Sequence, residues 1–347
     1  MSMKAKILEL LREKKDRVAA GAPESEAYVS GQELCEQFGV SRTAVWKAIG
    51  QLKKEGYVIE AVQNRGYRLL DQTEEVYNQA DIQSRLKTKW VAHPLLFFDS
   101  IDSTNIRAKL EAEQGAESGL LVVSDMQSAG RGRRGRGWES PAGINIYSTL
   151  MLKPDFSSDC APMLTLVMAL AVAKGIRQTL RRDSEEAAAK VGIKWPNDIV
   201  VDGKKVCGIL TEMSMEQGYI QHIVIGVGIN VRKQEFPEEI RDRAAAIDEQ
   251  CGFRISRSQL IADIMEAFEE DYEIFLRTHD LKGLRASYAE LLVNQDREVC
   301  VLDPKGEYRG IARGINDQGE LLVERQDGTV EEVYAGEVSV RGIYGYV

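Results

Sequence analysis

The chain has 347 residues, of which 44% are hydrophobic and 29% charged, with a formal net charge of −9. These values are typical of an ordinary soluble protein with two or three domains. Five cysteines without a CxxC pair, and three histidines not spaced as a metal pair, exclude a disulfide framework, a zinc site and a readily assembled histidine triad. The longest apolar run, residues 161–176, is shorter than the ~20 residues of a membrane span, and the N-terminus lacks the apolar core of a signal peptide, so we expect a cytoplasmic protein.

The N-terminal segment is mildly basic, whereas the rest of the chain is acidic. Residues 1–70 hold 12 Lys and Arg against 9 Asp and Glu, so they carry +3 and the remainder carries −12. This asymmetry permits contact with nucleic acid at the N-terminus.

Residues 1–70 are predicted to form a winged helix-turn-helix. Helical spacing of apolar residues and two serines placed as N-caps, Ser30 and Ser41, indicate three helices, over residues 3–15, 31–38 and 42–56. Two short strands, residues 57–62 and 66–70, are joined by a polar turn and form the wing.

The third helix is the one expected in a major groove, since its apolar residues face inward and leave polar and basic side chains outside. With its cap and a wing arginine, the expected DNA-binding residues are Ser41, Arg42, Thr43, Trp46, Lys47 and Arg65. The alternative is a three-helix module that binds protein. A basic patch absent from the outer face of residues 42–47 would exclude DNA binding.

Residues 71–89 are expected to be a linker with a short polar helix over 80–86. The central domain, residues 90–290, then alternates many strand-like apolar runs with helices at about 103–114, 160–180 and 256–278. The strands are mostly adjacent in sequence and separated by short turns. A mixed or largely antiparallel sheet with helices on one face is therefore favoured over a doubly wound parallel sheet, and the fold class expected is α+β.

The C-terminal residues 291–347 are expected to form a small five-stranded β-barrel. Short alternating strands there are joined by turns that contain glycine, such as Asp317-Gln318-Gly319 and Asp327-Gly328.

The most specific segment of the chain is residues 130–138, GRGRRGRGW, in which four arginines are interleaved with four glycines. Glycine lets the backbone approach a ligand closely, and guanidinium groups recognise phosphate or carboxylate in a bidentate way. A strand-like run ending at Gln127 precedes this Arg/Gly loop and another follows it, so the loop is expected between two core strands and is predicted to wrap an anion. Taken alone, the loop is also compatible with a solvated basic linker or a nucleic-acid-binding tail.

Four local motifs follow one another in the central domain: Asp102–Asn105 (DSTN), the Arg/Gly loop, Lys194–Asp198 (KWPND), and Lys205 with Gly208 followed by Gly226–Asn230 (GVGIN). With this order the chain closely resembles the bacterial bifunctional biotin protein ligases that also repress the biotin operon. The resemblance covers essentially the whole chain. It implies a central class II synthetase-like mixed sheet with helices and a C-terminal SH3-like barrel.

The resemblance also implies a reaction in two halves. The carboxylate of biotin attacks the α-phosphorus of ATP to give biotinyl-5′-adenylate and pyrophosphate, and a lysine of a carrier protein then attacks the acyl group and releases AMP. Both nucleophiles come from the substrates, so the enzyme needs only to position them and offset charge. Mg²⁺ is implied as the partner of the ATP phosphates, although no all-protein metal cage is visible in the sequence.

The resemblance implies a role for individual residues. Lys205 matches the lysine that contacts the reacting oxygens, and Arg133 matches the position that retains the reactive intermediate; these two are the expected catalytic residues. The expected biotin-binding residues are Ser103, Thr104, Asn105, Gln127, Gly130, Arg131, Gly132, Lys205 and Gly208. The expected ATP-binding residues are Arg133, Arg136, Trp138, Asn230 and Arg341. No adenine contact is assigned in residues 182–190 or 232–253.

Spacing alone leaves simpler interpretations open. Ser103 and Thr104 could serve only as helix caps, Lys205 could be a surface lysine, and Trp138 could plug the core instead of packing on adenine. Asn197 and Asp198 are expected to hold the site from a turn at Pro196, with a purely structural Asp198 as the alternative.

The expected partners are a biotin carboxyl carrier protein domain, operator DNA and a second copy of the chain when the adenylate is bound; no membrane partner is expected. Three other functions stay open at this stage: a lipoate or octanoate ligase, a repressor that only senses biotin, and a ligase whose winged helix no longer binds DNA.

Overall fold

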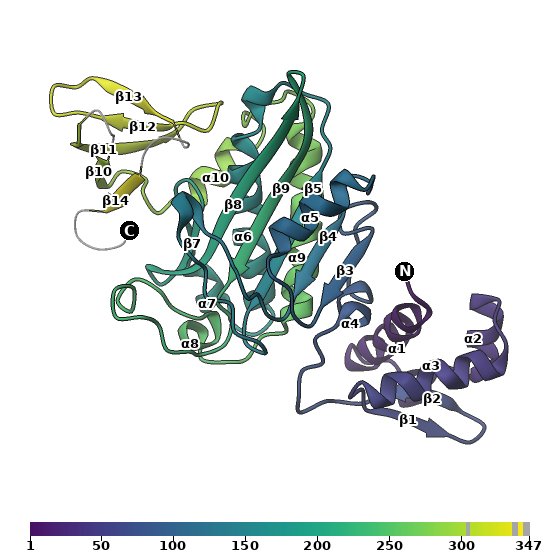
Figure 1. Ribbon diagram of the computed structural model, residues 1–347. Coiled ribbons are helices and arrows are strands. Elements are labelled where there is room, and N and C mark those ends of the chain that lie inside the picture. The colour runs from purple at the N-terminus through teal and green to yellow at the C-terminus, as the bar shows by residue number, and fades with distance from the viewer. Residues whose placement is uncertain (303–305, 335–338, 343–347) are drawn as a thin grey trace. The chain divides into compact units, whose positions relative to one another are not determined.

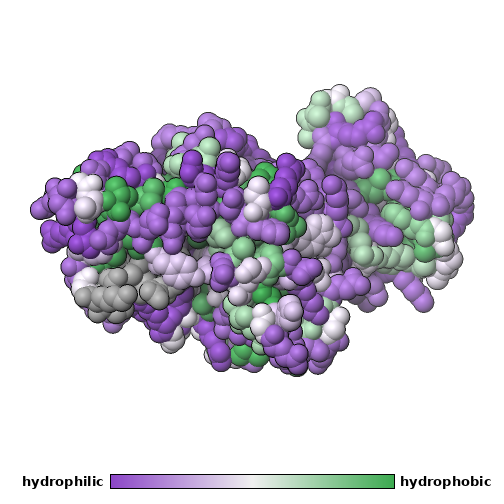
Figure 2. Space-filling view, turned by 90° about the horizontal axis from the view of Figure 1, so that it is seen from above, coloured by the Kyte–Doolittle hydropathy of each residue, from purple (hydrophilic) through white to green (hydrophobic). Residues whose placement is uncertain are grey.

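The computed structural model describes residues 1–302, 306–334 and 339–342 of the chain. The chain divides into two compact units, Met1–Leu86 and Lys87–Val347. The first unit therefore includes most of the segment expected as a linker. On the face shown in Figure 2, hydrophilic residues predominate and hydrophobic ones are scattered.

The first unit contains the three helices and the two-stranded wing predicted from the sequence. The helices are α1 (Met3–Ala19), α2 (Gly31–Phe38) and α3 (Arg42–Lys54), with a short 3-10 helix η1 (Glu24–Ala27), and the wing pairs β1 (Ile59–Val62) antiparallel to β2 (Gly66–Leu69). The Ser30 and Ser41 hydroxyls accept hydrogen bonds from backbone N–H groups at the starts of α2 and α3, as predicted. Gly66 is required by the wing, because a Cβ there would lie 2.1 Å from the Val29 carbonyl oxygen.

A short helix, α4 (Gln79–Gln83), packs on this winged helix and explains why the first unit extends to Leu86. Asp81 is almost fully buried and accepts hydrogen bonds from Arg12, from Arg85 at 3.2 Å and from the Tyr57 hydroxyl at 3.2 Å. Burial raises the pKa of Tyr57 and lowers that of Arg12. The segment expected to be a free linker is thus fixed to α1 by a buried polar cluster.

The second unit is built on one seven-stranded sheet, and the expected mixed α+β fold is confirmed. Its strands, in spatial order, are β3 (Leu95–Phe98), β4 (Leu121–Ser124), β5 (Ile146–Leu152), β9 (Tyr219–Ile229), β8 (Lys204–Glu216), β7 (Asp198–Val201) and β6 (Val191–Lys194). β3 and β4 are parallel, and all other neighbours are antiparallel.

Two long helices, α6 (Met163–Arg181) and α9 (Arg257–Phe275), pack on each other and cover one face of this sheet (Figure 1). By length and composition, Ser158–Arg181 passes as a candidate membrane span, but 72% of its most apolar window is buried inside this unit, as expected of a core helix. The helix α5 (Thr104–Glu113) lies on the opposite face, where Ala108 packs against Met151 and Val224. The expectation that helices occupy one face therefore holds for α6 and α9 but not for α5.

The remaining short elements connect these layers and were only partly anticipated. They are η2 (Arg133–Gly135), η3 (Ser158–Cys160), α7 (Glu185–Ala189), α8 (Ile247–Cys251) and α10 (Arg285–Leu291). The helix α7 begins at Ser184, whose hydroxyl accepts from the Ala187 N–H, so the polar stretch that carried no motif is a capped helical turn.

The C-terminal part forms an antiparallel five-stranded sheet, in agreement with the number of strands expected. Its spatial order is β13 (Val330–Val333), β12 (Leu321–Glu324), β11 (Tyr308–Ile315), β10 (Glu298–Leu302) and β14 (Ser339–Gly342). Trp195, at the end of β6, is buried against this part of the chain: its backbone N–H donates to Asn294 Oδ1 and its indole N–H to the Gly319 carbonyl, each at 2.9 Å.

Candidate functional site

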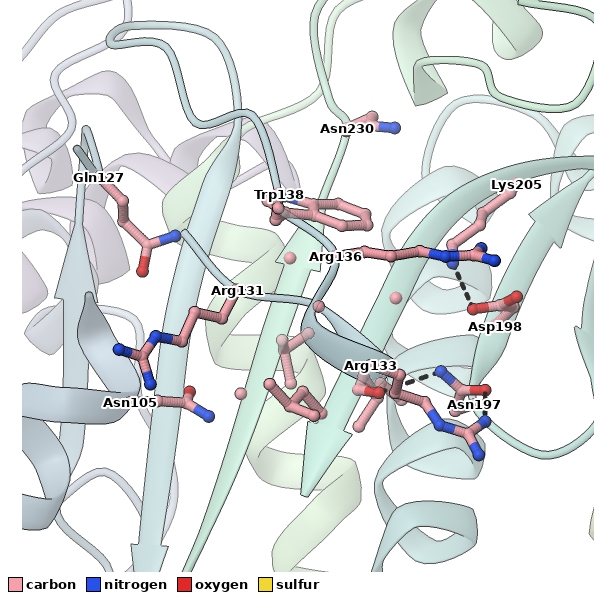
Figure 3. A pocket seen from close by; sticks show the side chains of 18 of the residues that line it. Asn105, Gln127, Arg131, Arg133, Arg136, Trp138, Asn197, Asp198, Lys205 and Asn230 are labelled. Carbon is pink, nitrogen blue, oxygen red and sulfur yellow. Dashed lines mark hydrogen bonds and ion pairs between the residues drawn. The ribbon is translucent and has the colours of Figure 1, made fainter. Parts of the chain in front are cut away.

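A cavity of about 340 Å³ opens on the face of the sheet that carries α5. Four segments far apart in sequence meet there: the start of α5, the Arg/Gly loop, the β7–β8 hairpin and the end of β9 (Figure 3). The predicted site residues that line it are Ser103, Thr104, Asn105, Gln127, Arg131, Gly132, Arg133, Arg136, Trp138, Lys205, Gly208 and Asn230. Asn197 and Asp198 line it as well.

Two predicted residues do not line the cavity in the described part of the chain. Gly130 lies at the root of the Arg/Gly loop, where a Cβ would come within 2.3 Å of the Trp138 carbonyl oxygen, so this position requires glycine for packing. Arg341 lies in β14, but its side chain is outside the described residues.

The Arg/Gly loop folds back on itself as a small hairpin over the cavity. The Gly132 N–H donates to the Arg136 carbonyl at 2.8 Å, and the Trp138 N–H donates to the Gly130 carbonyl at 2.9 Å. Arg134 takes a left-handed conformation (φ 58°) at the tip, which turns the chain within three residues. All four arginines of the loop, Arg131, Arg133, Arg134 and Arg136, line the cavity.

The Trp138 ring lies on a platform of two glycines. Gly208 and Gly228 are opposite one another in β8 and β9, and Cβ atoms there would come within 3.0 Å and 2.6 Å of the indole. The Lys205 ammonium lies 5.6 Å from the ring centroid, within the range of a cation–π contact. The glycines of the two motifs therefore make room for the aromatic ring that ends the loop.

The cationic end of the cavity is held by the β7–β8 hairpin. Lys205 Nζ is 2.5 Å from Asp198 Oδ1, and Arg133 Nη1 donates to Asn197 Oδ1 at 2.7 Å (Figure 3). Asn197 in turn donates from Nδ2 to the Ile209 carbonyl at 3.0 Å, which fixes its amide. Burial lowers the pKa of Arg133, as expected for a cation removed from water. The two expected catalytic cations are thus positioned by neighbouring residues of the KWPND motif.

The other end of the cavity is formed by the start of α5. Ser103 occupies the N-cap position but its side chain makes no capping hydrogen bond; instead Gln127 Oε1 accepts from the Thr104 N–H at 2.8 Å and lies 3.0 Å from the Thr104 hydroxyl. Gln127 Nε2 donates to Ser140 Oγ at 3.0 Å. Ser103 is therefore the N-cap by position only, and Gln127 supplies the side-chain cap from another segment.

Sequence reasoning identified Asn105 but not its partners Glu212 and Lys109, which are about one-third exposed beside the cavity. Asn105 Nδ2 and Lys109 Nζ each donate to the Glu212 carboxylate at 2.7 Å, and the Thr149 hydroxyl donates to Asn105 Oδ1 at 2.7 Å. Burial favours a higher pKa for Glu212, but the hydrogen bonds from Asn105 and Lys109 outweigh it and hold the pKa below its usual value. The signal available in the sequence was Glu212 itself, an isolated acid within the apolar run that forms β8.

Sequence reasoning also left residues 232–253 without a role. Ile240, Arg243 and Ala244 line the cavity. The Lys205 N–H donates to the Arg243 carbonyl at 2.7 Å, and the Ala245 N–H donates to the Lys205 carbonyl at 2.9 Å. These backbone bonds fix the segment beside Lys205, although no motif in the sequence pointed to it.

The predicted DNA-contacting residues are exposed in the first unit. Arg42, Thr43, Trp46 and Lys47 face solvent from α3, and Trp46 is 68% exposed, which is unusual for so large an apolar side chain. Arg65 is exposed on the wing, 5.7 Å from the centre of the Tyr28 ring. The basic outer face of residues 42–47 that DNA binding requires is therefore present.

Three family models match the chain. Residues 97–230 match the biotin/lipoate A/B protein ligase family, residues 24–68 match an HTH domain, and residues 296–341 match the biotin protein ligase C terminal domain.

The whole chain is similar to curated relatives. It is 36% identical over 329 residues to the bifunctional ligase/repressor BirA of Bacillus subtilis (strain 168), covering 94% of this chain and 98% of the relative. It is 32% identical over 312 residues to the protein of that name from Escherichia coli (strain K12), covering 90% and 92%.

A similar solved structure is that of the biotin protein ligase from Aquifex aeolicus in complex with biotin and ATP. It aligns with a TM-score of 0.60 at 28% identity and covers 72% of this chain and 98% of that one.

Proposed function

Since the chain belongs to the family of bifunctional biotin ligases and repressors, we propose that it joins biotin to a carrier protein at the expense of ATP and represses transcription through its winged helix. The observation that supports this most strongly is the convergence of four separate motifs on one cavity. The acyl-adenylate route needs no nucleophile from the enzyme, which agrees with a cavity rich in cations and amides.

In the first half-reaction, a biotin carboxylate oxygen attacks the α-phosphorus of ATP, the bond to the bridging oxygen breaks, and pyrophosphate leaves. Lys205 Nζ and the guanidinium groups of Arg133 and Arg136 would offset the negative charge that crowds around that phosphorus. Asp198 holds Lys205 in place through an ion pair of 2.5 Å. In the second half-reaction, the neutral amine of a carrier lysine attacks the acyl carbon, an amide bond forms, and AMP leaves.

We assign the two ends of the cavity to the two substrates. The biotin ring system would lie at the start of α5, against the buried Ser103 and Thr104 and the partly buried Gln127, since these polar groups suit a small ureido ring. The adenosine would lie near Trp138, with Asn230 and the segment that carries Arg243 beside the phosphates and ribose. The Arg/Gly loop would then exclude water from the adenylate, which hydrolyses when exposed.

Magnesium would enter as part of the ATP substrate. Among the residues that the structure describes, no group of three His, Cys, Asp or Glu side chains is placed to hold a metal ion. Mg²⁺ commonly keeps several waters and binds substrate phosphates, so the site need only accept the complex.

For the repressor function, we propose that α3 enters the major groove of operator DNA, with Arg42 and Lys47 on phosphates or bases and Arg65 reaching from the wing. The adenylate would order the Arg/Gly loop and favour a homodimer that presents two recognition helices to a two-fold operator. A cytoplasmic location is part of this proposal. The dimer is tested by sedimentation with biotin and ATP; an unchanged dissociation constant would contradict the coupling.

The first test of the ligase is intact-mass analysis of a carrier domain. The purified protein is incubated with ATP, Mg²⁺ and either biotin or lipoate, together with a biotin carboxyl carrier domain or a lipoyl domain. A biotin-sized mass increase on the carrier is expected. Modification with lipoate alone would make the protein a lipoate ligase, and no modification with either acid would favour a repressor that only senses biotin.

A further inference from the structure

A chain of hydrogen bonds runs beneath the cavity from α5 to the end of the Arg/Gly loop. It begins at Lys109 and Asn105, which both donate to Glu212 on β8 at 2.7 Å. The Thr149 hydroxyl donates to Asn105 Oδ1 at 2.7 Å and lies 2.8 Å from the hydroxyl of Thr104. Asn105, Thr149 and Thr104 are buried, so water cannot easily substitute for these partners.

The same chain continues into the loop. Thr104 donates to Gln127 Oε1 from its backbone N–H, and its hydroxyl, whose single proton goes to Thr149, lies 3.0 Å from the same oxygen. Gln127 Nε2 donates to Ser140 Oγ, and Ser140 donates to the Trp138 carbonyl at 2.9 Å. The side chains that face the expected ureido end of the cavity are therefore members of one connected network.

Glu212 determines the direction of this network. A carboxylate only accepts hydrogen bonds, so the Asn105 amide must turn its NH₂ towards Glu212 and its oxygen towards Thr149. Thr149 has one proton, and giving it to Asn105 Oδ1 leaves a lone pair for the hydroxyl of Thr104. A neutral group at position 212 that both donates and accepts would leave either orientation of Asn105 possible.

Lys109 keeps Glu212 in its charged, correctly aimed state. Its ammonium donates to Oε1 of Glu212 at 2.7 Å, whereas Asn105 donates to Oε2. The side chains of Lys109 and Glu212 are about one-third exposed, at 34% and 29%. One turn of α5 separates Lys109 from Asn105, so the same helix supplies both donors to the carboxylate.

We propose that Glu212, held by Lys109, is a positioning residue that fixes the orientation of Asn105 and so tunes the cavity to a cyclic urea. This rests on the proposed function. A urea offers two N–H donors and one carbonyl acceptor in a fixed plane, whereas the dithiolane ring of lipoate offers none. A fixed pattern of donors and acceptors on Asn105, Thr104 and Gln127 discriminates between these two ring systems, because a mismatched ligand leaves buried polar groups unpaired.

The test compares E212Q with the wild type and with E216Q. Glutamine keeps the size of Glu212 but presents an amide that Asn105 can meet in either orientation. Glu216 is on the same strand, is exposed and takes no part in the network, so E216Q controls for the loss of one negative charge. The steady-state KM and kcat for biotin, the KM for ATP, and the ratio of biotin to lipoate affinity are measured for each, with thermal unfolding as a check on folding.

E212Q is expected to raise the KM for biotin about tenfold and to lower the biotin-to-lipoate ratio by a similar factor, because one charge-assisted hydrogen bond is lost from the network. Its kcat at saturating biotin and its KM for ATP should stay within about twofold of E216Q, since a positioning role at the ureido end leaves the reacting atoms in place. K109R should keep wild-type values, whereas K109M should shift them in the direction of E212Q.

The outcomes separate this inference from the function on which it rests. A wild-type protein that does not bind biotin would overturn the proposed function and this inference with it. A wild type that binds biotin while E212Q behaves like E216Q would overturn the inference alone. Equal increases in the KM values for biotin and ATP, with a lowered unfolding temperature, would make Glu212 merely structural and would also overturn it.

Discussion

Because Trp138 packs directly on Gly228, we predict that Gly228→Ala displaces the indole and weakens ATP binding. Gly228 is the next-to-last residue of β9 and is paired in regular register with both neighbouring strands, so its backbone accepts alanine without strain. The added Cβ, however, would lie 2.6 Å from Trp138 Cε2 and 2.7 Å from Nε1. Ordinary carbon contacts lie at about 3.5–4.0 Å, so the indole must retreat by about 1 Å.

The magnitude follows from the rigidity of the ring and of its surroundings. The Trp138 backbone is hydrogen-bonded to Gly130, so the ring cannot retreat without moving the root of the Arg/Gly loop. Overpacking of this kind costs about 1–3 kcal/mol, which corresponds to a fall in the population of the closed loop of about 5-fold to 150-fold. We expect the affinity for ATP, measured by calorimetry in the presence of biotin, to fall within that range.

A double-mutant cycle separates the clash from other effects of the methyl group. In a Trp138→Ala background there is no indole to displace, so adding Gly228→Ala should change the ATP affinity by less than about threefold. If the methyl group weakens binding equally in both backgrounds, Gly228 is needed by the ligand itself or by the sheet, and the argument from the indole is refuted.

Four other predictions concern separate parts of the chain. Arg133→Gly should release activated biotin and label lysines of bystander proteins on a mixed protein background; an unchanged labelling pattern would contradict the retention role. Asp81→Asn should destabilise the first unit by about 3–5 kcal/mol, seen as a lower denaturation midpoint, because two partly buried arginines lose the buried carboxylate that pairs with them; a midpoint within error of the wild type would show that the cluster adds no stability. Lys47→Ala should weaken binding to all DNA sequences alike and reduce the salt slope by about 1, so a loss confined to one sequence would argue for a base contact. The pKa of Glu212 is lowered in the folded protein, so its contribution to the free energy of unfolding is complete above the ordinary value of 4.5 and is lost as the pH falls through the lower folded-state pKa. The difference in the free energy of unfolding between wild type and E212Q should therefore be constant near neutral pH and shrink only in acid.

Most of the fold could be predicted because its elements have strong local signals. Ser30 and Ser41 precede apolar helical patterns, and both cap the helices that follow. The strands of the central sheet are apolar runs with short turns between them, and adjacent strands in sequence tend to pair. The helix α4 could not be assigned to the first unit in this way, because its attachment depends on Asp81 meeting Arg12, a pairing of residues far apart in the sequence.

The candidate site shows the same division between local and non-local signals. The glycines, arginines and Lys205 stand in motifs that can be read directly. The role of Gln127 as the cap of α5 cannot be predicted, because it depends on a loop crossing the start of a helix 23 residues earlier in the chain. Arg243 was missed for a related reason: its backbone meets Lys205 through bonds that any residue can make, so the sequence carries no specific mark of the contact.

The contacts of Lys205 suggest how one lysine serves the crowded anionic site of the proposed reaction. Its ammonium is shared between the Asp198 carboxylate and the face of Trp138, so the cation is already partly desolvated and held in one direction. An incoming phosphate or carboxylate competes with Asp198 for this ammonium, which lowers the affinity for any single anion. In the proposed reaction the biotin carboxylate and the α-phosphate would lie beside Lys205 together, and the two anions would then compete with Asp198 more strongly than either one alone. We infer that Asp198 is more than a structural residue, because in the proposed reaction it would make the attraction of the site strongest where the two reacting groups meet.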